Sequence, residues 1–252
     1  MAEAMIKGLT SQGMKDILVS EPMEERREYL KKSYSIETTG SNKDLASSCR
    51  IIILAIKPQN METVLDEIKE IVTEEQTVVS IAAGIKLDYL SSKLKTKKLI
   101  RVMPNTPALV QEGMSVMSLC ECFSDNDITV VRDILMSIGR VVTLPERYMD
   151  AVTALSGSGP AFIALFIEAM IEGAETIGLN KDDARTLAVQ TVLGTSKLLD
   201  TGMDPVRLRE MVTSPGGTTA AGLAVFNEKK LKDTVKAAVI AARNRSEELG
   251  RS

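Results

Sequence analysis

The chain has 252 residues and a formal net charge of -3, which argues against nucleic acid or an anionic membrane as a partner. Its 44% hydrophobic and 26% charged residues are typical of a globular protein rather than a disordered one. Histidine is absent, which excludes Ser-His-Asp and Cys-His catalysis and histidine-ligated metals, and no metal site is expected.

The first half of the chain alternates strand-like and helix-like segments. A short apolar run at residues 17–19 precedes a charged helical stretch at 22–32. The continuous apolar run at 51–56 is typical of a strand buried on both faces, and a helical pattern follows it through residue 71. Four more strands and one helix are expected, the strands at 77–83, 99–103, 114–120 and 140–144 and the helix at 125–138.

Strand signals stop after Pro145, and only helical patterns follow. These helices are expected at 146–153, 160–177, 182–200, 205–211 and 220–249. Strands that alternate with helices predict an α/β fold with a doubly wound, mainly parallel sheet. We therefore expect two domains, an α/β domain at residues 1–145 and an all-α domain at residues 146–252.

The most apolar part of the chain is the segment 159–179, in which Glu168, Glu172 and Glu175 share one helical face. This spacing predicts an amphipathic helix rather than a membrane span. Together with the segment 220–242, it carries more apolar surface than a small helical domain readily buries, so a homodimer is expected.

The three cysteines, Cys49, Cys120 and Cys122, have no C-x-x-C spacing. Cys120 and Cys122 would share one face if their segment is a strand, although buried or partly buried thiols are the simpler interpretation. Reduced thiols without a signal peptide predict a cytoplasmic protein.

A loop of sequence TSPGGTT runs from Thr213 to Thr219, between two helical patterns. Its two glycines let the backbone approach a ligand, and its last residues fall where a new helix exposes unpaired N–H groups. The loop is therefore predicted to hold a small carboxylate, with a simple capped helix start as the alternative. The predicted contacts are Ser214, Gly217, Thr218 and Thr219.

With its flanks, this loop reads LREMVTSPGGTTAAGL at residues 208–223, which closely resembles the signature of Δ1-pyrroline-5-carboxylate reductases. Further motifs of that family follow its order and spacing: AIKP at 55–58, SIAAG at 80–84, RVMPNTP at 101–107 and DAVTALSGSGPA at 150–161. The resemblance covers essentially the whole chain. It implies a Rossmann-like domain followed by a helical dimerisation domain, and a homodimer that can assemble into a decamer of dimers.

The resemblance also implies the reaction, a hydride transfer from NADPH or NADH to the cyclic imine 1-pyrroline-5-carboxylate that yields L-proline. It places the hydroxyl of Thr153 near the substrate nitrogen as the catalytic group, and Glu146 near the substrate. The alternatives are a helical threonine bonded to the preceding turn and an exposed first-turn glutamate. Met211 stands where some relatives carry asparagine, so a contact at that position is in doubt.

The predicted cofactor contacts follow the strands, because ligands of open α/β sheets bind at the carboxyl ends of their strands. Two strands end in the triplets Ile56, Lys57, Pro58 and Ala82, Ala83, Gly84. The resemblance adds Asn42 on the adenosine side. Ser20 replaces the acidic residue that commonly marks NAD preference, and Arg26 and Arg27 lie nearby, which favours NADPH, whereas Glu21 favours NADH.

Family members begin with a strand and a G-x-G-x-x-A turn, whereas this chain opens at Met1 in what resembles the helix after that turn. Either the chain is a truncated reductase, or it is a non-catalytic homologue that keeps the fold but has lost cofactor binding. Without the turn we expect weak nucleotide binding and little activity. A further rival is a hydroxy-acid reductase, whose catalytic lysine motif only loosely matches residues 194–197.

Overall fold

The computed structural model describes residues 1–120 and 125–250, so Cys122 and its suggested shared face with Cys120 lie outside the described residues. Packing divides the chain into two compact units. Unit 1 comprises Met1–Gly157 and Ala242–Ser252, and unit 2 comprises Ser158–Ala241. The domain division expected between residues 145 and 146 stays a prediction, because packing alone defines these units.

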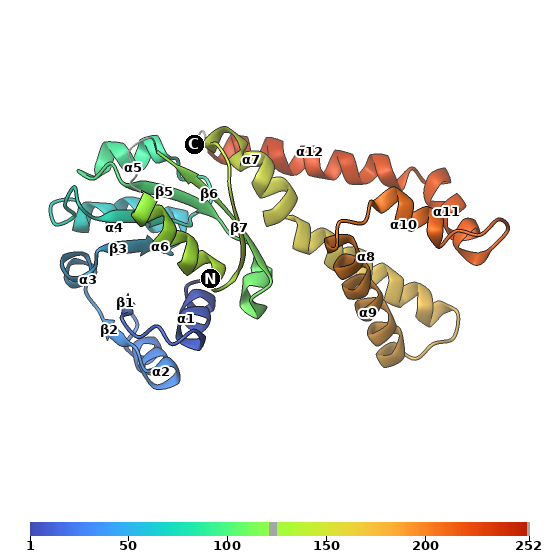
Figure 1. Ribbon diagram of the computed structural model, residues 1–252, viewed down its shortest axis with the longest axis horizontal. Coiled ribbons are helices and arrows are strands. Elements are labelled where there is room, and N and C mark those ends of the chain that lie inside the picture. Colours follow the sequence, from blue (N-terminus) through green and yellow to red (C-terminus); the bar gives the residue numbers. More distant parts are fainter. Residues whose placement is uncertain (121–124, 251–252) are drawn as a thin grey trace. The chain divides into compact units, whose positions relative to one another are not determined.

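Unit 1 is built on two β-sheets (Figure 1). The larger has the strand order β3-β4-β5-β6-β7, and its neighbours are parallel except for the antiparallel pair β5 and β6. The smaller pairs β1 with β2 in parallel. The strands are β1 Leu18–Ser20, β2 Glu37–Thr39, β3 Ile51–Leu54, β4 Thr77–Ser80, β5 Leu99–Met103, β6 Gly113–Leu119 and β7 Gly139–Thr143.

Both faces of the larger sheet are covered by helices, because successive side chains of its strands point to opposite faces. Val78 packs in a cluster with side chains of α3, α4 and α5, whereas Val79 packs in a second cluster with α1 and α6. These helices are α1 Ala2–Ser11, α3 Asn42–Ser48, α4 Met61–Ile68, α5 Leu87–Lys93 and α6 Asp125–Met136. Strands buried on both sides confirm the expected doubly wound α/β fold class.

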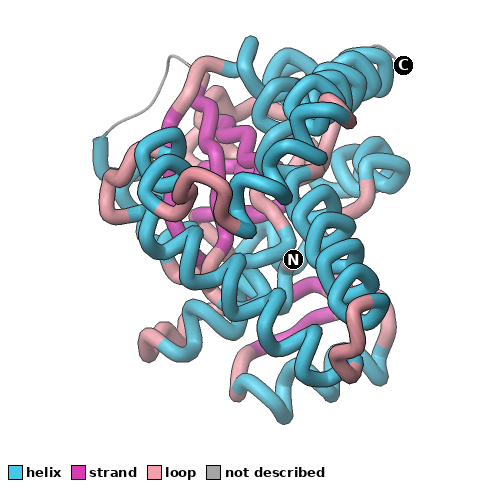
Figure 2. Tube along the Cα trace, turned by 90° about the vertical axis from the view of Figure 1, so that its right-hand side faces the viewer, coloured by secondary structure: helices cyan, strands magenta, loops and turns pink. Residues whose placement is uncertain are grey.

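The smaller sheet forms its own apolar cluster, in which Ile6 of α1 and Leu30 of α2 (Glu24–Tyr34) pack near Val19 of β1. No strand pairing joins β1 to β3 in the part of the chain that the structure describes. Figure 2, with strands in magenta, shows a short strand pair apart from the larger sheet. Unit 1 therefore holds two separate sheets, with a gap between β1 and β3.

A short helical segment follows β7 at the end of unit 1. It comprises a 3₁₀ turn at Glu146–Tyr148, α7 at Met149–Val152 and a π turn at Thr153–Gly157. The end of α12 packs beside it, where the Ser246 hydroxyl donates a hydrogen bond of 2.7 Å to the Asp150 carboxylate. This segment carries Glu146 and Thr153.

Unit 2 is entirely helical in its described residues, and its helices are α8 Gly159–Thr176, α9 Lys181–Asp200, α10 Pro205–Met211, α11 Thr218–Glu228 and the first part of α12 Leu231–Leu249. The Asn180 side chain caps α9 by accepting from the backbone N–H of Asp183 at 2.9 Å. In the single chain only Ala184 and Ala188 of these helices are buried. Leu165 is 65% exposed and Ile177 is 82% exposed.

The single helix expected at 220–249 is wrong, because α11 ends at Glu228 and α12 begins at Leu231. Lys230 has φ of 54°, in the left-handed region that interrupts a helix. Strand β4 ends at Ser80 rather than at residue 83, and the backbone N–H of Ala82 donates to the Ser80 hydroxyl at 3.3 Å. The short elements β2, α3 and α5 carry no long apolar period and were not predicted.

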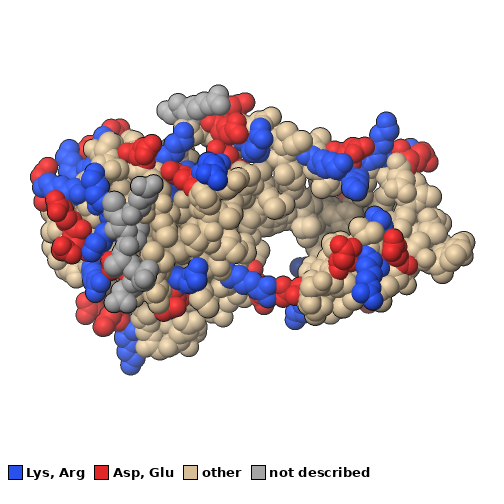
Figure 3. Space-filling view, turned by 45° about the horizontal axis from the view of Figure 1, so that its top comes forward, with Lys and Arg blue, Asp and Glu red and all other residues tan. Residues whose placement is uncertain are grey.

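By length and composition alone, the helical stretch 146–176 would be able to cross a membrane, with a mean hydropathy of 1.6 in its most apolar window. Only 6% of that window is buried within the chain. On the face drawn in Figure 3, acidic and basic side chains of the described residues are interspersed, without a broad area of one sign.

Candidate active site

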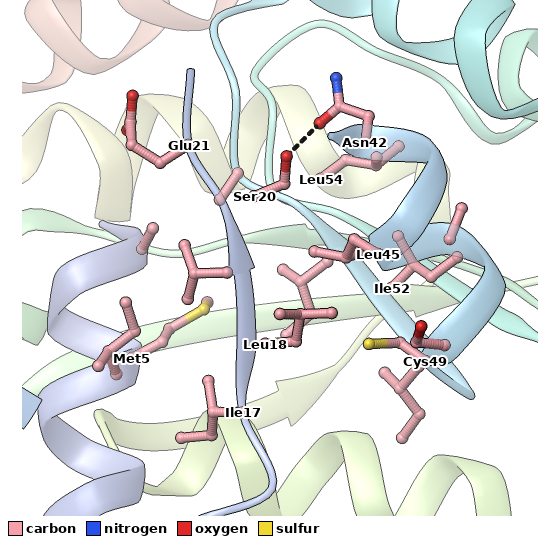
Figure 4. Close-up of a pocket in the computed structure, with 18 of the residues that line it drawn as sticks. Met5, Ile17, Leu18, Ser20, Glu21, Asn42, Leu45, Cys49, Ile52 and Leu54 are labelled. Carbon is pink, nitrogen blue, oxygen red and sulfur yellow. Dashed lines mark hydrogen bonds between the residues drawn. The ribbon is translucent and has the colours of Figure 1, made fainter. Parts of the chain in front are cut away.

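The first group of predicted site residues lies where β1 ends. The Ser20 hydroxyl donates a hydrogen bond of 2.8 Å to the Asn42 carbonyl oxygen (Figure 4). The Asn42 amide nitrogen in turn donates to the Glu67 carboxylate at 2.8 Å. The structure therefore brings Ser20 and Asn42 together and fixes the Asn42 amide in one orientation.

The second group follows β3 and β4, which are paired in parallel with Leu54 opposite Ser80. Because the two strands end at the same level, the segments after them share one edge of the sheet. Ile56 is half-buried, whereas Lys57 and Pro58 are exposed at the start of a 3₁₀ turn.

Small residues line the segment after β4. Ala82 is buried, Ala83 is exposed, and Gly84 has φ of 79°. This φ lies in the left-handed region that favours glycine. A Cβ atom added at Gly84 would be in ordinary van der Waals contact with the carbonyl oxygen of Leu249 at 3.8 Å, so the end of α12 lies close to this turn.

Glu146 is held by two hydrogen bonds and is not a freely exposed first-turn glutamate. Its Oε1 atom accepts from the backbone N–H of Leu87 at 2.9 Å and from Arg101 Nη1 at 3.0 Å. Arg101 is only 6% exposed, within the buried strand β5. The bond to Leu87 ties the segment that leads to Thr153 to the chain after β4, and the bond to Arg101 ties the same segment to β5.

Thr153 begins the π turn at the end of α7. Its hydroxyl donates a hydrogen bond of 2.8 Å to the carbonyl oxygen of Met149, one turn earlier. This is the bond that a helical threonine makes to its preceding turn. The bond engages the hydroxyl hydrogen, so toward any further partner this hydroxyl acts as an acceptor.

Asn105 was missed by the sequence analysis, although it lies in the RVMPNTP motif. Its amide nitrogen donates to the carbonyl oxygen and the hydroxyl of Ser156, both at 3.2 Å. Its carbonyl oxygen accepts from the backbone N–H of Met114 at 2.8 Å. Asn105 therefore fixes the π turn that carries Thr153 against strand β6.

Arg101 was also missed, and here the sequence did hold a signal. It is the one charged residue in the run LIRVM of β5. A charge in a strand that is buried on both faces requires a partner, because an unpaired buried charge is strongly unfavourable. That requirement points to a carboxylate near the carboxyl edge of the sheet.

The two arginines beside Ser20 are already engaged. Arg26 forms a short ion pair with Glu3 of α1, and Arg27 donates to the backbone carbonyl oxygens of Glu21 and Pro22 at 2.8 and 2.9 Å. Hydrogen bonds from Tyr34 and Arg26 hold the pKa of the Glu3 carboxyl below its usual value. The same bond with Glu3 raises the pKa of Tyr34 to about 12.

The predicted carboxylate loop lies in unit 2 and leads into α11. The backbone N–H of Gly217 donates to the carbonyl oxygen of Ser214 at 3.0 Å, which closes a turn, and Gly216 has φ of 71°. Gly217 is the N-cap of α11, so Thr218 and Thr219 occupy its first turn. Gly217 provides no capping side chain, and the first amides of this helix remain available to a ligand.

Two family models match the chain. "NADP oxidoreductase coenzyme F420-dependent" matches residues 1–84, and "Pyrroline-5-carboxylate reductase dimerisation" matches residues 146–249. A pyrroline-5-carboxylate reductase from Synechocystis sp. is 39% identical over 255 residues, covering 100% of this chain and 95% of the relative. The chain belongs to the pyrroline-5-carboxylate reductase family.

Solved structures of the family share the fold. A pyrroline-5-carboxylate reductase from Coxiella burnetii matches with a TM-score of 0.92 at 33% identity, covering 98% of this chain and 94% of that chain. The pyrroline carboxylate reductase of Plasmodium falciparum with NADP bound matches with a TM-score of 0.87 at 32% identity, over 98% and 94%. Membership confirms the resemblance and makes the chain an NAD(P)H-dependent oxidoreductase of proline biosynthesis.

Proposed function

We propose that this chain reduces 1-pyrroline-5-carboxylate to L-proline with a nicotinamide nucleotide held at the carboxyl edge of the larger sheet. The observation that carries the proposal is the shared edge of β3 and β4, where Lys57 and Gly84 follow two strands that end at the same level. The carboxyl ends of parallel strands are the usual ligand edge of such sheets.

The residues at this edge fit a reduced nicotinamide nucleotide. Ala82, Ala83 and Gly84 offer no large side chain where the nicotinamide would lie. Lys57 is an exposed cation for the phosphates, and the hydrogen-bonded pair Ser20 and Asn42 would hold the adenosine side. When bound, the cofactor supplies the hydride.

We assign the substrate nitrogen to the hydroxyl of Thr153. A cyclic imine is basic enough to carry a proton in water, so its nitrogen reaches the site as an N–H donor. The Thr153 hydroxyl gives its hydrogen to Met149, so it would meet that donor as an acceptor. No strong general acid is then needed, which agrees with a chain that lacks histidine.

We propose that Thr153→Val, which removes the hydroxyl at nearly constant volume, lowers kcat more than it raises KM. The matched variant Thr153→Ser keeps the oxygen and should retain most of the rate. The loss of one charge-assisted hydrogen bond is worth about 1.5–3 kcal/mol, so a roughly tenfold to hundredfold decrease is expected. Equal rates for the valine and serine variants would contradict this role.

The substrate carboxylate is assigned to the loop before α11. Its support is the uncapped helix start, the turn closed from Gly217 to Ser214, and the two hydroxyls of Thr218 and Thr219. Glu146 is assigned a place near the substrate, where the bonds of its Oε1 atom to Arg101 and to the backbone of Leu87 would hold it.

For the cofactor we propose a preference for NADPH over NADH. Ser20 puts no negative charge at the end of β1, where a carboxylate would repel a 2′-phosphate. Arg26 contributes less than its position suggested, because Glu3 compensates its charge. The ratio of kcat/KM for the two nucleotides measures this preference, and a ratio favouring NADH would overturn it.

Assembly and location complete the proposal. The exposed apolar side chains of α8, with Leu165 at 65% exposure, support a homodimer formed through unit 2, which can build a decamer of dimers. Cys49 and Cys120 are free thiols, which supports a cytoplasmic enzyme. Sedimentation resolves dimer from decamer, and a monomer at micromolar concentration would overturn both.

The decisive experiment titrates NADPH and NADH by fluorescence and follows pyrroline-5-carboxylate turnover in parallel. It compares the chain with a variant in which a strand and a G-x-G-x-x-A turn are joined ahead of Met1. Turnover in either form supports the proposal. A folded, dimeric variant that neither binds a nucleotide nor forms proline would favour the non-catalytic homologue.

A further inference from the structure

The carboxyl end of α12 packs on α7, the one-turn helix that precedes Thr153. Although α12 begins in unit 2, its residues from Ala242 onward pack with unit 1. The Ser246 hydroxyl donates a hydrogen bond of 2.7 Å to the Oδ1 atom of Asp150 in α7. The two residues are 96 positions apart in the chain, and both are partly buried. This bond therefore joins two distant segments at a point that is partly shielded from water.

The same end of α12 also borders the turn after β4. A Cβ atom added at Gly84 would lie 3.8 Å from the carbonyl oxygen of Leu249, and one added at Gly250 would lie 3.6 Å from Cε of Lys86. The backbone N–H of Gly250 donates to the carbonyl oxygen of Ser246 at 3.0 Å, which closes the last turn of the helix. The residue that bonds α7 thus belongs to the turn that borders Gly84.

Helix α7 depends on its neighbours for its position. It has only four residues, and so short a helix has little stability of its own. Its buried side chains Met149 and Val152 pack in one apolar cluster with Val116 of β6. The bond from Ser246 adds a polar attachment through Asp150. The sheet and the end of α12 therefore both hold α7 in place.

Thr153 follows the position of α7 closely. Its backbone N–H donates to the carbonyl oxygens of Asp150 and Met149, which lie in the single turn of that helix. Its hydroxyl also donates to the carbonyl oxygen of Met149. Because both groups of Thr153 are bonded to α7, any shift of the helix moves the hydroxyl with it.

Two further attachments hold the ends of the same segment. Glu146 at its start accepts from the backbone N–H of Leu87, three residues after Gly84. Ser156 near its end accepts from the amide nitrogen of Asn105. The bond between α7 and α12 lies between these two points, next to Thr153 itself.

We propose that Asp150 and Ser246 are positioning residues for hydride transfer, which fix the Thr153 hydroxyl relative to the turn at Gly84. The inference rests on the proposed function, in which the nicotinamide lies at that turn and the substrate nitrogen at Thr153. Both residues act through α7 and α12 rather than on the reactants. A misplacement of about 1 Å between reacting groups can cost roughly a hundredfold in rate, so the bond should influence kcat more than affinity.

The kinetic test removes each partner of the bond in turn. Ser246→Ala and Asp150→Ala should each lower kcat about tenfold, with KM for NADPH and for pyrroline-5-carboxylate within about threefold. Ser246→Thr keeps the hydroxyl and should retain most of the rate. Glu248→Ala is the matched control, because it breaks the exposed ion pair with Arg245 in the same turn of α12 and should change nothing.

An isotope measurement separates positioning from a simple loss of folded protein. With NADPH deuterated at C4, the primary isotope effect in Ser246→Ala should rise or become more dependent on temperature, because hydride transfer itself is impaired. A loss of folded molecules lowers the rate but leaves both KM and the isotope effect unchanged. That pattern, or a threonine variant as slow as the alanine variant, would overturn the proposal.

Amide hydrogen exchange tests the same bond without turnover. The Thr153 amide should exchange about tenfold faster in Ser246→Ala, because its acceptors lie in the helix that has lost an attachment. The Val78 amide, which donates to Lys98 within the sheet at 2.9 Å, should exchange as before. Unchanged exchange at Thr153 would overturn the proposal whatever the rates. Absence of turnover in the unaltered chain would count against the proposed function, and exchange at Thr153 then decides on the two positioning residues.

Discussion

The two units leave different groups without partners. Unit 1 has a developed core, in which side chains such as Leu65, Val79 and Ile100 are fully buried, yet its sheet is interrupted between β1 and β3. Unit 2 buries only two alanines of α9 among its helices and exposes large apolar side chains along their length. In the described residues, unit 1 thus leaves the backbone groups of two strand edges without a neighbouring strand, whereas unit 2 leaves large apolar side chains exposed.

This difference shows how much each region depends on what covers it. The gap between β1 and β3 leaves two strand edges of three and four residues unpaired in the described structure, and the surrounding core is kept by its side-chain contacts. Helices without a buried face have no such reserve, since most helical stability in proteins comes from packing of the apolar face. We therefore expect unit 2 to respond more strongly to interface changes than unit 1 responds to changes at the gap between β1 and β3.

The largest effect is expected for Leu165→Asp in α8. Burying a leucine side chain contributes about 1.5–3 kcal/mol to the free energy of association. A symmetric dimer contains two copies of Leu165, so the substitution removes this contribution twice, and the dimer dissociation constant should rise roughly thousandfold. Glu168→Gln, on the same helix, is the matched control and should leave the dimer intact. Sedimentation equilibrium measures both, and a dimeric aspartate variant would remove unit 2 as the interface.

The next effect concerns the interrupted sheet of unit 1. A strand and glycine-rich turn joined ahead of Met1 should increase NADPH affinity about a hundredfold, because each added amide gives the cofactor phosphates a charge-assisted hydrogen bond worth about 1.5–3 kcal/mol. Alanines in place of the two turn glycines provide the control. Fluorescence titration measures the change, and equal tight binding with and without the turn would show that the turn is dispensable.

A smaller effect is expected at the carboxylate loop. Thr219→Ala should weaken inhibition by L-proline about tenfold, while NADPH affinity stays within about twofold, because only one hydrogen bond to a charged group is lost. Thr213, outside the first turn of α11, gives the control variant Thr213→Ala. Unchanged proline inhibition in the Thr219 variant would remove this loop from the substrate site.

The smallest effect concerns Glu3, whose pKa is lowered by its bonds with Tyr34 and Arg26. A carboxyl with a lowered pKa stabilises the folded state above its ordinary pKa of 4.5, and this contribution is lost as the pH falls through the lower, folded-state value. Glu3→Gln should therefore flatten the acid side of the stability curve. Urea denaturation across that range measures it, and identical curves would contradict the contribution.

Much of the fold was predictable because it rests on local patterns. The apolar run of β3 and the change to helical periods after Pro145 carry the α/β architecture in the sequence itself. The break between α11 and α12 was not predictable, because a single lysine with positive φ produces it and no glycine marks the place. The short strand β2 has too few residues for a period to be seen.

The candidate site was predictable where motifs carry it and not where it depends on pairing. Ser20 and Asn42 were each predicted as cofactor contacts from the sequence, whereas their hydrogen bond to one another appears only in the structure. Glu146 was placed near the substrate, but its bonds to Arg101 and Leu87 depend on residues far away in the chain. Asn105 was missed for the same reason, since its role depends on where the π turn packs.

The most direct test of the proposed reaction follows the hydrogen itself. Pyrroline-5-carboxylate is incubated with NADPH deuterated at C4 of the nicotinamide, using the chain and the variant with a strand and turn joined ahead of Met1, and the proline formed is analysed by mass spectrometry and NMR. The account predicts L-proline with deuterium at C5, and loss of that product in Thr153→Val. Folded protein that yields no proline in either form, or proline without deuterium at C5, would contradict it.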